Sequence, residues 1–246
     1  MTLKIKTREI HYTAADGSQL VGYFAAPESE TPVAGVLVSP EWWGRNDYTE
    51  QRARELAEHG YAAFALDMYG DKKVTTDAKQ AYTWMMQTFD HPDTIVTRAS
   101  AALTTLAQQS EVNADKLAAI GFCYGGKVIL DLARSGAALK AVATFHATLS
   151  TATPAQANQV QAEILVQHGE LDSMVSLDDV AVFKQEMLAA HVEHEVIVYA
   201  GAKHGFTNPL ADERAKANDV DLGYNAAAEQ QSLAAMYALL DRKLRA

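Results

Sequence analysis

The chain has 246 residues, a formal net charge of −10 and a hydrophobic content of 48%, values typical of a soluble globular protein. The acidic balance argues against nucleic acid and against an anionic membrane surface as partners. The single cysteine excludes an internal disulfide, and neither a signal peptide nor an apolar membrane span is evident, so we expect one cytoplasmic domain covering residues 1–246.

The predicted elements alternate between strands and helices. Apolar runs and alternating patterns indicate strands at residues 8–13, 20–25, 33–39, 61–66, 117–120, 139–145, 164–167 and 195–199. Helical periodicity indicates helices at residues 48–59, 76–89, 93–108, 124–133, 177–190 and 226–244. This order predicts an α/β fold with a doubly wound, mostly parallel sheet, and Asp16-Gly17 predicts an antiparallel hairpin at the N-terminus.

Local signals set several boundaries. Asp47 is expected to cap the first helix, with Glu50 completing a capping box, and Pro92 is expected to start the third helix. The connection between Phe145 and Ile164 contains a polar, alanine-rich stretch at residues 150–160, which we interpret as a loop or a short helix. It is too short for a large cap domain, so an open site is expected.

A glycine-framed cysteine lies between a predicted strand and a predicted helix. The pattern G-x-C-x-G-G places Gly121 before Cys123, and Gly125 and Gly126 after it. A nucleophile at a tight strand-to-helix turn needs small neighbours, because a Cβ atom on either side would collide with the helix. The pattern is that of the nucleophile elbow of α/β-hydrolases, with cysteine in place of serine. The alternative is a buried, inert cysteine.

Two further reactive side chains follow predicted strands. Asp172 and His204 come after Cys123 in the order nucleophile, acid, histidine, which is the order of α/β-hydrolases. Side chains at the carboxyl ends of parallel strands meet at one edge of the sheet, so we expect a triad there. Glu170 is the rival acid, since Asp172 could instead cap the next helix. His204 could be a surface histidine.

The remaining histidines give no strong metal signal. His191 and His194 are close in sequence, but no third ligand is evident and a solvated turn is the favoured interpretation. We expect the protein to need no metal and no organic cofactor. A small-molecule substrate is the expected partner, and the chain is expected to be a monomer or a homodimer.

The chain resembles the dienelactone hydrolase family, cysteine hydrolases of the α/β-hydrolase fold, over essentially its whole length. The segments that carry the resemblance are P-E-W-W-G-R-N-D (40–47), G-Y-A-A-F-A-L-D-M-Y-G (60–70), G-F-C-Y-G-G (121–126), H-G-E-L-D (168–172) and H-G-F-T-N-P (204–209). The resemblance implies an α/β-hydrolase fold and a catalytic triad of Cys123, Asp172 and His204.

The resemblance also implies a fourth catalytic group and an oxyanion hole. Glu41 is expected to contact Cys123 and activate it, and the backbone N–H groups of Tyr124 and Trp42 are expected to bind the oxyanion. A carboxylate beside a thiol disfavours the thiolate. We therefore hypothesise that the thiol rests neutral until substrate binding frees Glu41 to accept its proton. The alternative is a rim carboxylate that caps the helix after Asn46.

The expected substrate contacts differ from those of relatives that act on dienelactone. Those relatives carry an arginine shortly after the catalytic histidine to grip the substrate carboxylate, whereas His204 is followed by G-F-T-N-P. Arg45 and Lys79 are the candidates for a substitute cation. Trp43 and Phe206 are candidates for an aromatic acyl pocket, although burial in the core is the default for aromatic side chains. The other aromatic candidates are Trp42, Tyr82, Trp84 and Tyr124.

These observations predict a hydrolase of a small carboxylic ester or lactone, similar to carboxymethylenebutenolidase, that acts through a thioester on Cys123. A thioesterase or acyl transferase with the same triad is the first alternative. The second is a non-catalytic small-molecule binder, which would have no need of nucleophile, acid and base together. A serine esterase is disfavoured because the sequence contains no G-x-S-x-G motif.

Overall fold

A computed structural model describes residues 3–91 and 93–245. The strands are β1 (Ile5–Thr13), β2 (Gln19–Pro27), β3 (Val33–Ser39), β4 (Ala62–Ala65), β5 (Val112–Phe122), β6 (Ala141–Phe145), β7 (Glu163–Gly169) and β8 (His194–Tyr199). The helices are α1 (Asp47–Glu58), α2 (Ala78–Gln87), α3 (Thr94–Ala107), α4 (Tyr124–Arg134), α5 (Leu177–Ala189), α6 (Ala211–Asn218) and α7 (Ala226–Leu244).

The eight strands form one sheet in the order β1-β2-β4-β3-β5-β6-β7-β8. β1 and β2 form an antiparallel hairpin, and β2 is also antiparallel to β4. From β4 to β8 all neighbouring strands are parallel. The predicted α/β fold, with its mostly parallel sheet and N-terminal hairpin, is therefore confirmed.

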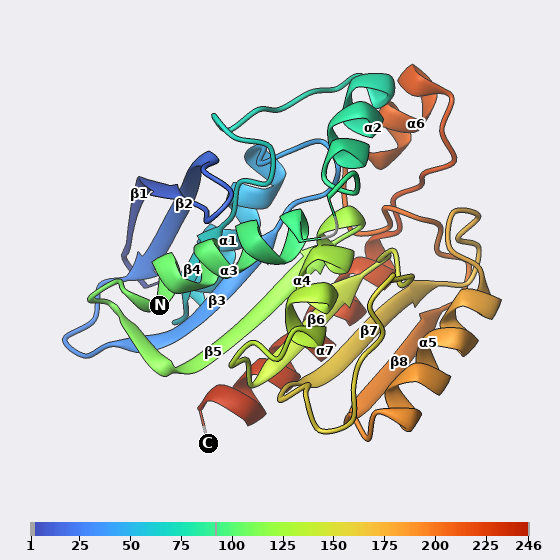
Figure 1. The fold of residues 1–246 in the computed structure, drawn as a ribbon. Coiled ribbons are helices and arrows are strands. Elements are labelled where there is room, and N and C mark those ends of the chain that lie inside the picture. The colour runs from blue at the N-terminus through green and yellow to red at the C-terminus, as the bar shows by residue number, and fades with distance from the viewer. Residues whose placement is uncertain (1–2, 92, 246) are drawn as a thin grey trace.

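Helices cover both faces of the sheet (Figure 1). α1 and α7 pack on one face, and α3, α4 and α5 pack on the other. The parallel strands are consequently buried on both sides, which explains their continuous apolar sequences. α2 and α6 lie side by side at one end of the sheet, near the start of α4 (Figure 1), where Ala81 and Ala211 share a small apolar cluster.

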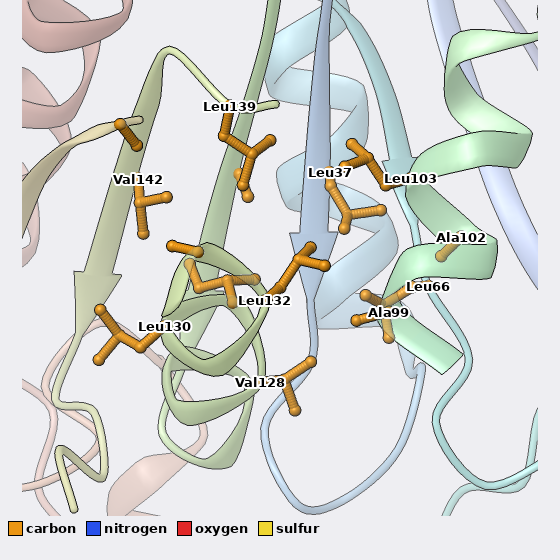
Figure 2. Close-up of a cluster of buried hydrophobic side chains, with 14 of the residues drawn as sticks. Leu37, Leu66, Ala99, Ala102, Leu103, Val128, Leu130, Leu132, Leu139 and Val142 are labelled. Carbon is orange, nitrogen blue, oxygen red and sulfur yellow. The ribbon is translucent and has the colours of Figure 1, made fainter. Parts of the chain in front are cut away.

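The larger core cluster fixes α4 against the sheet. Figure 2 shows Val128 and Leu132 of α4 beside Leu37 of β3, with Leu103 of α3 nearby. Val128, Leu132 and Leu37 are fully buried. Because this helix begins directly after Cys123, its packing also fixes the position of that residue.

Three local expectations need correction or restriction. The cap of α1 is Asn46 rather than Asp47: its side chain accepts a hydrogen bond of 3.3 Å from the Thr49 N–H. Asparagine and aspartate are equally good caps, so sequence alone did not separate them. α6 was not predicted, because only Ala211 and Arg214 of its short polar sequence are buried. Pro92 lies outside the described residues.

The connection from β6 to β7 contains turns and bends but no helix or strand in the described structure. Within the part of the chain that the structure describes, no large cap domain covers the end of the sheet, as expected. The site at the carboxyl ends of the strands is instead bordered by α2 and α6, which follow β4 and β8 in the chain (Figure 1).

Candidate active site

Cys123 occupies the sharp turn between β5 and α4. Its φ of 54° and ψ of −120° are strained values for a residue with a side chain. The flanking glycines make the turn possible. A Cβ atom on Gly121 would lie 2.2 Å from the carbonyl oxygen of Gly125, and one on Gly125 would lie 2.4 Å from that of Pro40. The geometry is that of the predicted nucleophile elbow.

Asp172 and His204 meet as expected for the acid and base of a triad. Oδ2 of Asp172 lies 2.8 Å from Nδ1 of His204, and both side chains are buried. The other carboxylate oxygen accepts hydrogen bonds from the N–H groups of Met174 and Val175, at 2.9 and 3.0 Å. The rival Glu170 is exposed and binds the N–H of Gly201.

His204 interacts with Cys123 as well as with Asp172. Nε2 is buried and has no conventional hydrogen-bond partner among the described residues. Burial alone would lower the pKa of His204, but the negative charge of the Cys123 thiolate and the hydrogen bond to Asp172 raise that pKa to about 10.

The expected oxyanion donors are the backbone N–H groups of Trp42 and Tyr124. The described residues offer no acceptor to the N–H groups of Trp42 and Tyr124, so both can bind an oxyanion. Tyr124 is the first residue of α4, where free N–H groups and the helix dipole favour negative charge. Tyr69 supports the other donor, because its hydroxyl donates a hydrogen bond of 3.0 Å to the carbonyl oxygen of Trp42.

Glu41 is buried beside the loop that carries His204. Its Oε2 accepts a hydrogen bond of 2.7 Å from Nδ2 of Asn208, and Nη1 of Arg214 lies 3.5 Å away. Burial raises the pKa of Glu41, although Arg214, Asn208 and His204 oppose the shift. In this conformation the carboxylate is held by Asn208 and Arg214, and it does not cap α1, whose cap is Asn46.

The predicted substrate-binding cations lie apart from these contacts. The Arg45 side chain is fully buried in ion pairs with Glu9 and Glu50, and Lys79 is exposed on α2. The cation beside Glu41 is Arg214, which sequence reasoning missed because it lies in α6. Arg214 also lines a surface cavity of about 340 Å³ to which Arg45 contributes, and Cys123 does not line this cavity.

Two of the predicted aromatic contacts, Trp43 and Phe206, are packing groups in this structure. Trp43 is buried, with the guanidinium of Arg214 4.8 Å above its ring centroid. Phe206 is buried in a cluster with Tyr199. The aromatic ring near the nucleophile that the sequence did not single out is Tyr69, whose pKa is raised by burial and by charge on Tyr124 and Cys123.

A layer of buried polar groups lies behind the triad. His146 packs edge-on against His204, with ring centroids 5.2 Å apart, and its Nε2 lies 2.8 Å from Oγ1 of Thr207. His168 is also buried, and neither of its ring nitrogens has a partner among the described residues. Burial lowers the pKa of both His146 and His168, which favours the neutral form of each ring.

Within residues 3–91 and 93–245, no group of three or more His, Cys, Asp or Glu side chains is arranged to hold a metal ion. Across the same residues, no helix combines the length and apolar character needed to cross a membrane.

Comparison with known proteins is consistent with this geometry. The profile described as "Dienelactone hydrolase family" matches residues 20–244. A "Putative carboxymethylenebutenolidase" of Escherichia coli is 28% identical over 78% of this chain and 74% of its own. The structure of a dienelactone hydrolase-like promiscuous phosphotriesterase from metagenomic libraries is 36% identical, covering 98% of this chain and 99% of its own, with a TM-score of 0.91. A protein named m3DLH is 40% identical with the same coverages and a TM-score of 0.92.

Proposed function

The chain belongs to the dienelactone hydrolase family and is a hydrolase of ester or lactone bonds, and we propose that it cleaves a small substrate through a Cys123–His204–Asp172 triad. The observation that carries the proposal is the 2.8 Å contact between Asp172 and His204, with the remaining nitrogen of His204 buried and Cys123 at the elbow.

The first half of the proposed reaction forms a thioester. Sγ of the Cys123 thiolate attacks the acyl carbon, and the carbonyl oxygen gains negative charge that the N–H groups of Trp42 and Tyr124 stabilise. The C–O bond to the leaving group then breaks. The leaving alkoxide takes the proton from Nε2 of His204, so the imidazole becomes neutral.

The second half regenerates the thiolate. Nε2 of His204 accepts a proton from water, and the resulting hydroxide attacks the thioester carbon. The C–S bond breaks, the acid is released and the thiolate–imidazolium pair re-forms. Asp172 holds the tautomer of His204 and stabilises its charge throughout.

The test is hydrolysis of short chromogenic esters and simple lactones, including dienelactone, by wild type, Cys123→Ala and Cys123→Ser. We expect turnover by wild type, loss in the alanine variant, and a mass increase equal to the acyl group on Cys123 after rapid quenching. Equal activity of wild type and Cys123→Ala would remove Cys123 as nucleophile. Ligand binding without turnover by the folded wild type would favour a non-catalytic binder.

A phosphotriester substrate is a second candidate, because the relative described as a promiscuous phosphotriesterase is 36% identical over almost the whole chain. The same thiolate could attack phosphorus, and the same backbone donors could bind the phosphoryl oxygen. A chromogenic phosphotriester therefore belongs in the substrate panel. This activity would be favoured if the phosphotriester is turned over faster than the best carboxylic ester and if Cys123→Ala loses that turnover.

A further inference from the structure

Thr207 lies at the centre of a buried hydrogen-bond network that the proposed mechanism does not use. The residue is fully buried in the loop after β8. Its Oγ1 is 2.8 Å from Nε2 of His146, at the end of β6, and 2.7 Å from the hydroxyl of Tyr48, in α1. One side-chain oxygen thus ties the loop to the sheet and to a helix.

The backbone of Thr207 is fixed as well. Its carbonyl oxygen accepts hydrogen bonds of 3.2 Å from the Tyr48 hydroxyl and from Nη2 of Arg52. Arg52 is also in α1 and forms an ion pair with Glu229 of α7. Two side chains of α1 therefore hold Thr207, and α7 supports one of them through Glu229.

Thr207 is close in the chain to His204 and to the residue that binds Glu41, and these two groups, His204 and Glu41, are proposed to accept or donate protons. His204 precedes it in the same loop, and Asn208 follows it directly and binds Glu41. A displacement of Thr207 would move His204 relative to Cys123 and would also move the donor that holds Glu41. Displacements of about 1 Å in a catalytic group can cost about 100-fold in rate.

We propose that Thr207 is a positioning residue whose hydroxyl, bound to His146 and Tyr48, sets the place of His204 relative to Cys123 and of Asn208 relative to Glu41. This inference rests on the proposed function of Cys123 and His204.

The charges around His204 fit this arrangement. His204 interacts electrostatically with five titratable side chains, which are Cys123, Asp172, His146, His168 and Glu41. Among them the ring of His146 packs edge-on against that of His204, and burial lowers the pKa of His146, which favours its neutral form. The Thr207 hydroxyl gives this buried ring a hydrogen-bond partner.

The experiment compares Thr207→Val with Thr207→Ser. Valine keeps the shape and removes the hydroxyl, whereas serine restores it. We expect kcat of the valine variant to fall about 10- to 100-fold with KM within about threefold, and the serine variant to recover most of the loss. Thr144→Val is the matched control, because Thr144 is buried in β6 and its hydroxyl has no partner among the described residues.

A second readout does not depend on knowing the substrate. The rate of alkylation of Cys123 by iodoacetamide follows the thiolate fraction, which the His204 imidazolium sustains at low pH. We expect the alkylation profile of Thr207→Val to shift toward that of an ordinary thiol, and those of Thr207→Ser and Thr144→Val to match wild type. If Thr207→Val is too unstable to purify, Tyr48→Phe removes one partner of the same hydroxyl and should show the same shift at smaller size.

The outcomes separate the two proposals. Unchanged kcat and alkylation in folded Thr207→Val would overturn the positioning role and leave the triad intact. Equal losses in Thr207→Val, Thr207→Ser and Thr144→Val would also overturn it, since they would report general damage to the core. If wild type hydrolyses nothing but the alkylation shift appears as expected, the positioning role stands and the proposed substrate class fails.

Discussion

Nδ2 of Asn208 donates a hydrogen bond of 2.7 Å to Oε2 of Glu41, and this contact joins the loop that carries His204 to the loop that carries Trp42. The carboxylate is thereby held toward Arg214 rather than left free at the rim. Two segments far apart in the sequence thus share one buried polar contact. A movement of either loop on substrate binding would therefore change the position of Glu41 relative to Asn208.

Glu41→Gln tests the proposed role of this carboxylate. Burial raises the pKa of Glu41, so as the pH falls the carboxylate is lost at a higher pH than an ordinary glutamate would be. If Glu41 accepts the proton of a neutral Cys123 thiol, the wild-type rate should fall along an acid limb above the usual glutamate range, and Glu41→Gln should lower kcat about 10- to 100-fold and lose that limb. The measurement is kcat/KM against pH.

Glu50→Gln serves as the control for Glu41. Burial also raises the pKa of Glu50, but this residue lies in α1 in an ion pair with Arg45. Its substitution should leave the pH profile unchanged. A Glu41→Gln enzyme with wild-type turnover and an unchanged profile would remove Glu41 from the mechanism.

The charge state of the resting nucleophile can be measured by alkylation. Negative charge on Cys123 raises the pKa of His204, so in the proposed mechanism a thiolate on Cys123 and an imidazolium on His204 stabilise each other. This contrasts with the sequence-based hypothesis of a thiol that rests neutral beside Glu41. We expect the rate of alkylation by iodoacetamide at about pH 6 to lie within about threefold of the rate at about pH 8. The alkylation of an ordinary thiol would slow far more between these two pH values.

His204→Gln is the control for this experiment, since it removes the cation and keeps a polar side chain. Its alkylation should rise with pH as expected for an ordinary cysteine, whose pKa is about 8.5. If wild type already shows that ordinary profile, the thiol rests neutral and the earlier hypothesis for Glu41 regains support.

Asp172→Asn should inactivate the enzyme with little change in its fold. The amide cannot hold the productive tautomer of His204, and a comparable change in a serine protease triad lowers kcat by a factor of about 10⁴. We expect a loss of about 10³ to 10⁴ in kcat, measured by ester hydrolysis. Glu170→Gln is the matched control and should retain activity within about twofold. The reverse ranking would make Glu170 the triad acid.

The parts of the site that the sequence predicted are those that depend on local chain geometry. The elbow around Cys123 follows from glycines whose absent Cβ atoms would otherwise collide with neighbouring backbone. The position of Asp172 and His204 after buried strands follows from the parallel sheet, because all carboxyl ends lie at one edge. These features need no knowledge of distant contacts.

The remainder of the site depends on tertiary contacts that no local pattern encodes. Arg214 reaches Glu41 from a short polar helix without an apolar stripe, so its segment was interpreted as a loop. Thr207 and Asn208 stood in the quoted G-F-T-N-P segment, yet their partners lie far away in the chain. The burial of Arg45 in two ion pairs likewise follows from the packing of β1 against α1.

Arg214→Gln tests whether the substrate carries a negative charge. Arg214 is the cation beside Glu41, and an anionic substrate group would compete with the carboxylate for it. We expect the substitution to raise KM for carboxylate-bearing esters by about tenfold or more, and to change KM for neutral esters by less than about threefold. The readout is the pair of KM values on matched anionic and neutral substrates.

Lys79→Gln provides the comparison for Arg214. Lys79 is exposed on α2 and was an alternative candidate for the same role. Its substitution should affect both substrates equally. A larger effect of Lys79→Gln than of Arg214→Gln on the anionic ester would transfer the role to Lys79, and equal KM changes for both esters in Arg214→Gln would argue for a neutral substrate.

Gly121→Ala tests whether the elbow limits the stability of the fold. The added Cβ would lie 2.2 Å from the Gly125 carbonyl oxygen, which is backbone in the first turn of α4 and has little room to move. Overpacking of this kind costs about 1–3 kcal/mol, and we expect a decrease of at least that size in the free energy of unfolding measured with urea.

Gly223→Ala is the control, because its new Cβ would meet the flexible Lys203 side chain at 3.1 Å. The control should change stability by less than about 1 kcal/mol. If both variants unfold at the same urea concentration as wild type, α4 can shift away from β5, and the strain at Cys123 would then not be imposed by the packing of that helix.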